Sequence, residues 1–165
     1  MTIDHPLDGD RPGDAGLRVE VRVRDAVHPS AQEPIADVRA RVDELARAGY
    51  LDDAETVVWG RHLPLETDDD TGAMLEPFRR FRAWALRTGV DLEPAFRVHE
   101  TSTLGGEAAY SVVTVPLVCV AVYDGADVRA VYPHADAEGV VTVERGLERI
   151  AAGRLDAQTT GTPKQ

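Results

Sequence analysis

Apolar and charged residues alternate strictly near the start of the chain. From position 17 to position 24, a leucine or valine at each odd position is followed by an arginine or glutamate at each even position. A period of two, with one apolar and one charged side, is typical of a half-buried strand. The pattern therefore predicts a first β-strand over residues 17–24.

The next segment has helical spacing. Apolar residues at positions 35, 38, 42 and 45 form one stripe of an amphipathic helix. Pro34 suits the first turn, where the missing N–H is not needed, and Gly49 suits the end. These residues predict a helix over 35–49.

Two more helices are expected further along. In the first, either Asp70 or Thr71 can cap the start and Gly89 ends it. Its apolar face is predicted to include Phe78 and Phe81, widened by residues such as Leu86. A short last helix is expected over 142–153, capped by its threonine and ended by its glycine.

Several further segments have strand character. Residues 56–59 predict a strand that continues through 63–65, with Pro64 marking an edge or an end. Residues 94–101 predict another strand. The stretch 112–123 is almost entirely apolar, which indicates a central strand covered on both faces. A hairpin turn at 124–125 would then lead into a returning strand at 128–132.

The predicted order is β-α-β-α-β-β-β-α, which favours an α+β fold. We expect a single mixed sheet of about five strands, two main helices on one face, and a short C-terminal helix. Residues 17–153 form one predicted domain. Residues 1–16 are expected to be a disordered lead-in and residues 154–165 a flexible tail.

Charge changes this picture of the surface. The chain has 29 acidic and 18 basic residues, a formal net charge of −11, and a single lysine, Lys164. An acidic surface poor in lysine remains hydrated in concentrated salt, so a halophilic source is predicted. A GC-rich coding bias is the alternative explanation for the same residue usage.

The sequence contains little that points to catalysis. There is one cysteine, Cys119, which lies in the most apolar run and is expected to be a buried hydrophobe. No histidine pair has zinc-ligand spacing, although His99, His134 and Asp136 could meet across loops. Gly105-Gly106 lacks a P-loop lysine, and the acidic run at 68–70 lacks calcium-loop spacing.

These observations predict a protein that is not an enzyme and has no metal ligand and no cofactor. We find no signal peptide at the N-terminus and no apolar run of membrane-spanning length. A cytoplasmic location without membrane contact is therefore expected.

Four segments of the sequence together resemble a known protein family. They are RVEVRVRDAVHP at 18–29, VRARVDELARAGYLDDAETVVWGRHLPL at 38–65, FRAWALRTGVDLEPAFRVHET at 81–101, and VVTVPLVCVAVYDGADVRAVYPHADAEGVVTVERGL at 112–147. The chain resembles a haloarchaeal protein family that has a helix-turn-helix domain label. The resemblance implies a DNA-associated transcriptional regulator, but no activity, substrate or catalytic residue.

The helix at 35–49 is one candidate for reading DNA. A recognition helix needs a supporting helix before it, whereas residues 17–24 are predicted to be a strand. The exposed positions of this helix mix acidic and basic residues, as an ordinary solvated face does. The alternative is a helix that only connects two strands.

The following helix contains the only local basic cluster: Arg79, Arg80, Arg82 and Arg87. These arginines are the candidate nucleic-acid-binding residues, because guanidinium groups bind phosphate. The alternative is a solvated face opposite a core of aromatic residues. DNA is thus one predicted partner, and a protein partner or a homodimer is the other. The alternative function is a small-ligand or protein–protein interaction module with a ferredoxin-like α+β sandwich.

Overall fold

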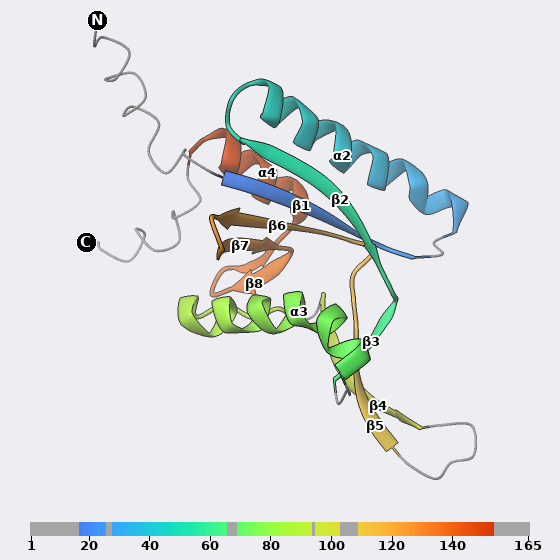
Figure 1. Cartoon of the computed structure of the whole chain (residues 1–165). Coiled ribbons are helices and arrows are strands. Elements are labelled where there is room, and N and C mark those ends of the chain that lie inside the picture. The colour runs from blue at the N-terminus through green and yellow to red at the C-terminus, as the bar shows by residue number, and fades with distance from the viewer. Residues whose placement is uncertain (1–16, 26–27, 66–68, 94, 103–108, 154–165) are drawn as a thin grey trace, which may run out of the picture.

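The main sheet of the protein has four strands in the order β2-β1-β6-β7 (Figure 1). The computed structural model describes residues 17–25, 28–65, 69–93, 95–102 and 109–153. The strands are β1 (Leu17–Arg24), β2 (Asp53–Trp59), β6 (Val118–Asp124) and β7 (Asp127–Tyr132). β1 pairs in parallel with β2 and antiparallel with β6, and β7 is antiparallel to β6.

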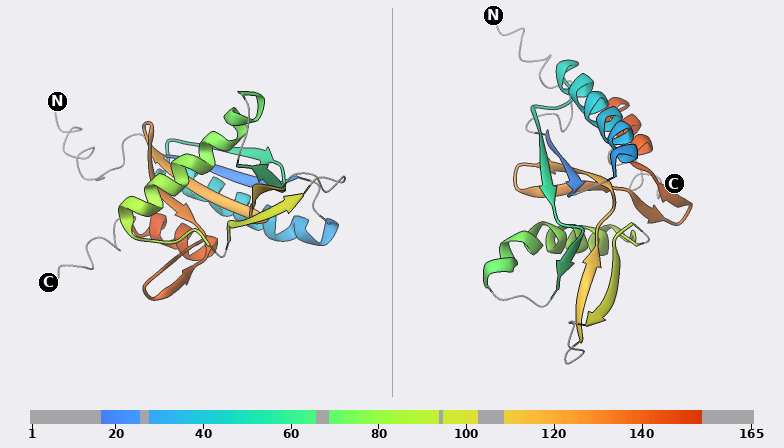
Figure 2. Two further views of the ribbon diagram at one scale, coloured as in Figure 1. Left: turned by 90° about the horizontal axis from the view of Figure 1, so that it is seen from below. Right: turned by 90° about the vertical axis from the view of Figure 1, so that its right-hand side faces the viewer.

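Helices cover both faces of this sheet (Figure 2). α2 (Gln32–Arg47) and α4 (Val143–Ala151) lie side by side on one face, and α3 (Asp69–Thr88) lies on the other. The prediction of two main helices on one face is therefore wrong. The reason lies in β6, where consecutive residues 119–123 are all buried, so apolar side chains on both faces need cover.

A second sheet projects from the main one. It consists of β3 (His62–Pro64), β5 (Ala109–Thr114) and β4 (Arg97–Ser102), in the order β3-β5-β4, and we name it the arm (Figure 1). A further pair, β8 (His134–Asp136) and β9 (Gly139–Val141), forms a small hairpin that the sequence did not predict. The fold is α+β as expected, but the described residues form three sheets and not one sheet of five strands.

The long apolar run at 112–123 is divided between the two larger sheets. β5 ends at Thr114, β6 begins at Val118, and Pro116 lies between them. Proline has no N–H and cannot continue the ladder of a central strand. The prediction of one uninterrupted strand is therefore wrong, because the chain changes sheets at this proline.

Gly49 and Gly89, which follow α2 and α3, have φ angles of 93° and 78°, as expected at helix ends. Thr142 caps the start of α4, as predicted, by accepting a hydrogen bond from the Arg145 N–H. The starts of α2 and α3 differ from the prediction. α2 begins earlier than predicted, directly after the 3₁₀ turn η1 (Pro29–Ala31). α3 already includes Asp69, which puts the predicted caps, residues 70 and 71, inside its first turn.

The core lies in the layers between the main sheet and the helices on its two faces. The odd-numbered residues of β1 are all buried, as the alternation predicts. None of the helices among the described residues is both long enough and apolar enough to cross a lipid bilayer. The predicted lead-in at 1–16 and tail at 154–165 lie outside the described residues.

Candidate nucleic-acid interface

α3 has one apolar face and one basic face. The apolar face is buried and consists of Leu75, Phe78, Phe81, Trp84 and Ala85. Phe81 contacts Trp59 of β2 edge to face, with the ring centroids 6.2 Å apart. The aromatic residues of this helix therefore belong to the core and are not available to stack on nucleic-acid bases.

Three of the four predicted arginines, Arg79, Arg82 and Arg87, are exposed. Glu76 is the only acidic residue between positions 75 and 88. Among the residues that the structure describes, none of the three arginines has a carboxylate within 4 Å. Arg82 lies over the ring of Phe78, 5.7 Å from its centroid, whereas Arg79 and Arg87 have no ion-pair partner in the described part of the chain.

Arg80 has a different environment. Its guanidinium group donates a hydrogen bond to the carbonyl oxygen of Ala126 in the β6–β7 turn. It also lies over the ring of Tyr123, 5.6 Å from the centroid. The structure therefore separates Arg80 from the other three candidates, because its side chain fastens α3 to the main sheet.

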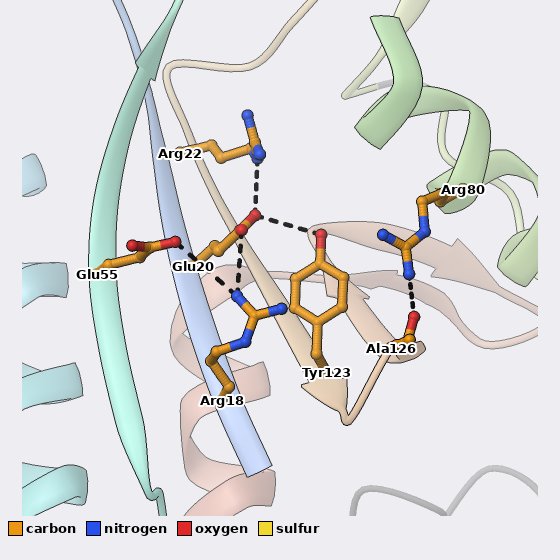
Figure 3. A network of polar contacts seen from close by, with 7 residues as sticks. All are labelled: Arg18, Glu20, Arg22, Glu55, Arg80, Tyr123 and Ala126. Carbon is orange, nitrogen blue, oxygen red and sulfur yellow. Dashed lines mark hydrogen bonds and ion pairs between the residues drawn. The ribbon is translucent and has the colours of Figure 1, made fainter. Parts of the chain in front are cut away.

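Tyr123 connects Arg80 to a network on the even-numbered side of β1 (Figure 3). The carboxylate of Glu20 accepts hydrogen bonds from Arg22 Nε at 3.0 Å and from the Tyr123 hydroxyl at 3.2 Å. Arg18 Nη1 lies 3.3 Å from the other Glu20 oxygen. Burial, with Glu20 nearby, raises the pKa of Tyr123 to about 12. We name Arg18, Glu20, Arg22 and Tyr123 the Glu20 network.

Most of the Glu20 network is buried, with Arg18 partly exposed at its edge. Glu20 is only 8% exposed, and Arg22 lies over the ring of Trp59 at 4.9 Å. The sequence pattern did not reveal it, because alternation alone predicts a charged face open to water. The signal was the residue type: a lone glutamate between two arginines on the same strand face provides its own charge partners.

A shallow hollow lies between α3 and the arm. It has a volume of about 240 Å³, and its lining includes Phe78, Arg82, Leu86, Phe96 and Val98. Leu86, which was predicted to widen the buried face of α3, is 82% exposed. That prediction is wrong, because the apolar face is complete without Leu86 and the side chain points outward beside Arg82.

α2 does not form a helix-turn-helix unit with its neighbours in the described sequence. β1 precedes it and β2 follows it, and both strands pair in the main sheet. Its residues Ile35, Val38, Val42 and Leu45 are buried, and the helix packs against β1, β2 and α4. The exposed residues include acidic ones such as Asp37 and Glu44, the latter 3.9 Å from Arg41. The prediction of a helix that connects two strands is confirmed.

The other candidate residues do not meet. His134 is buried against Tyr132 and Trp84, and its Nδ1 lies 2.7 Å from the carbonyl oxygen of Val131. His99 lies on the arm with His62. Within the described ranges, no group of three or more histidine, cysteine, aspartate or glutamate residues could hold a metal ion.

Cys119 is fully buried, as predicted. Burial raises the pKa of its thiol to about 12, so the reactive thiolate is strongly disfavoured. It packs as a small hydrophobic residue in β6. The arginines of α3 therefore remain the strongest candidate site of those that the sequence predicted.

Comparison with known proteins gives one result. Residues 12–155 match the family described as "Helix-turn-helix domain". No curated protein and no solved structure matches the chain. Because the match covers most of the 165 residues, the chain belongs to this helix-turn-helix domain family.

Proposed function

We propose that the protein is a non-enzymatic, DNA-associated transcriptional regulator of the cytoplasm, and that the outward face of α3 contacts the DNA backbone. One observation supports this most directly. Arg79, Arg82 and Arg87 are all exposed on α3 and have no carboxylate partner among the described residues, in a chain of net charge −11. Family membership points to the same class of function.

The geometry of α3 suits phosphate contacts. A helix rises about 1.5 Å per residue, so Arg79 and Arg87 are about 12 Å apart along the axis. Each guanidinium group can donate two parallel hydrogen bonds to one phosphate. Three such groups along one rigid helix would bind the backbone with little dependence on base sequence.

α2 is a weaker candidate for the same role. Its buried face is committed to the main sheet, and its exposed face mixes carboxylates with arginines. Acidic groups beside the arginines would repel phosphate. For this reason we assign the DNA contact to α3, although α2 is the helix whose position in the sequence resembles a recognition helix.

The test is duplex DNA binding as a function of salt, with two matched triple variants. The first removes Arg79, Arg82 and Arg87, each replaced by alanine. The second removes Arg39, Arg41 and Arg47 of α2 in the same way. Both change the net charge equally, so only the position of the lost charge differs.

We expect the α3 variant to lose most of its affinity and the α2 variant to retain it. The slope of log K against log salt should fall by about 2.7 in the α3 variant, since each lost phosphate contact removes about 0.9. An equal loss in both variants, or no binding by the wild-type chain at any salt concentration, would contradict the proposal.

A second candidate function is an interaction module, as the hollow beside α3 suggests. Leu86 is largely exposed at its rim, and Phe78 and Phe96 form part of its lining. An apolar ligand or the side chain of a second copy could enter it. Leu86→Ser should then weaken self-association in sedimentation experiments without changing DNA binding.

A further inference from the structure

The outer face of the arm brings together basic and titratable side chains from three strands. His62 of β3 and Arg97 of β4 both lie opposite Thr114 of β5, so the three side chains share one face of the sheet. His99 follows Arg97 by two residues and points the same way. All except the half-buried Thr114 are exposed. We name His62, His99 and Thr114 the histidine face.

One hydroxyl group joins the two histidines. Thr114 Oγ1 lies 3.0 Å from His62 Nδ1 and 2.8 Å from His99 Nε2. The imidazole rings are 5.9 Å apart and nearly perpendicular. Since the hydroxyl has a single hydrogen, it can donate to only one ring and must accept an N–H from the other.

We call the two ring nitrogens that do not contact Thr114, His62 Nε2 and His99 Nδ1, the outward nitrogens. When both rings are neutral, this constraint determines which of them donates a hydrogen bond and which accepts one. The ring that accepts from Thr114 has its proton on the outward nitrogen, which is then a donor. The ring that donates to Thr114 has a lone pair on its outward nitrogen, which is then an acceptor. One added proton turns this acceptor into a second donor.

The surrounding charge is positive. Desolvation, followed by the charges of Arg61, His99 and Arg24, lowers the pKa of His62. No carboxylate of a described residue contributes to this shift. Arg24 is held at the base of the arm, where Nε and Nη2 donate to the carbonyl oxygen of Val115. Arg61, adjacent to His62, is exposed and has no ion pair with a described residue.

We infer that the histidine face, with Arg61, binds a tetrahedral oxyanion of the phosphate class and takes up one proton as it does so. An anion can accept hydrogen bonds from both outward nitrogens, and the positive charge of Arg61, which acts on His62, adds to the attraction. The anion's negative charge offsets the repulsion from the positive charges that lower the pKa of His62. This site lies on the arm, apart from the α3 arginines, and does not depend on the proposed function.

Sulfate is the first probe, because it does not titrate near neutral pH. Its affinity for the full-length chain is measured by calorimetry or NMR between about pH 5.5 and pH 8. We expect the affinity to rise about tenfold per pH unit as pH falls, since one proton is bound with the anion. The rise should end below the pKa of His62 in the free protein.

Three variants test whether the proton taken up with sulfate binds to the histidine face. The double substitution His62→Gln and His99→Gln retains hydrogen-bonding groups that do not titrate, so sulfate affinity should become independent of pH. Arg61→Gln should weaken binding and move the pH profile to higher pH, because a repelling charge is lost. His28→Gln, which changes an exposed histidine outside the arm, is the control and should leave the profile unchanged.

Inorganic phosphate and a short DNA duplex identify the source of the anion. Competition of the duplex with sulfate, weakened by the double histidine variant, would indicate a backbone phosphate. Competition by inorganic phosphate alone would indicate a free phosphate group. Absence of sulfate binding, or a pH profile that the double variant does not flatten, would overturn the inference. The α3 triple variant should still bind sulfate, which separates this result from the test of the DNA proposal.

Discussion

Arginines occur in two contrasting environments in this protein, on β1 and on α3. Arg22 of β1 is almost buried, donates to Glu20 and lies over Trp59. Arg79 of α3 is exposed and has no carboxylate partner in the described part of the chain. The same residue type therefore stabilises the fold in one place and leaves unused charge in the other. The difference is set by whether the partner lies in the same sheet.

The largest loss of stability should come from a change at the buried arginines of β1. Glu20→Gln removes the charge that balances Arg22 and Arg18 while retaining the shape of the side chain. We expect a loss of about 3 kcal/mol in the free energy of unfolding, because a buried arginine is left without its counter-ion. Urea unfolding measures it.

Glu55→Gln is the matched control for Glu20→Gln. Glu55 also lies near Arg18, at 3.8 Å, but about half of its side chain is exposed. Its removal should cost less than about 0.5 kcal/mol. Equal losses in the two variants would show that burial is not what distinguishes the β1 arginines.

Arg80 should show an intermediate effect, because it belongs to α3 but is fastened to the main sheet. Arg80→Ala removes the hydrogen bond to Ala126 and the contact with the Tyr123 ring. We expect a loss of about 1 kcal/mol in the free energy of unfolding. A loss no larger than that of Arg79→Ala would place Arg80 with the free arginines.

Tyr123→Phe tests, through the pH dependence of stability, how much the Tyr123 hydroxyl contributes to the Glu20 network. The pKa of Tyr123 is raised from 10 to about 12 in the folded protein, so the protonated hydroxyl contributes stability that is fully present below pH 10. That contribution is lost as pH rises towards 12. The variant should lose about 1 kcal/mol at neutral pH with the hydrogen bond to Glu20. Its stability should then decline less than that of the wild type in alkaline urea titrations.

The smallest effect on stability is expected on the exposed side. Arg79→Ala and Arg87→Ala should each change the free energy of unfolding by less than about 0.5 kcal/mol. Thermal unfolding of the single variants checks this. A larger loss would mean that these arginines have structural partners, and the charge available to DNA would be smaller than proposed.

Sequence pattern predicted the local elements well where a single period dominates. The alternation in β1 and the apolar stripe of α2 depend on residues that are near neighbours in sequence, and both elements are confirmed. The glycines at 49 and 89 have the positive φ angles expected at helix ends. These features follow from local backbone preferences.

The arrangement of the sheets and the Glu20 network could not be predicted from such local patterns. Which face a helix covers depends on β6, whose two apolar faces give no sign of what packs on each. Glu20 is buried by Tyr123, which is 103 residues away in the chain, and Thr114 joins two histidines from different strands. Such contacts arise from tertiary pairing, and a residue-by-residue period carries no information about them.

The bend at Pro116 determines how a force on the arm reaches the rest of the molecule. On one side of the bend the Val115 N–H donates to the carbonyl oxygen of Arg61, and on the other the Leu117 carbonyl oxygen accepts from the Arg24 N–H, both at 3.0 Å. The Arg24 side chain also donates a hydrogen bond to the Val115 carbonyl oxygen. The connection between the arm and the main sheet is therefore held on both sides of Pro116. A force on the arm is transmitted to β1 through these hydrogen bonds.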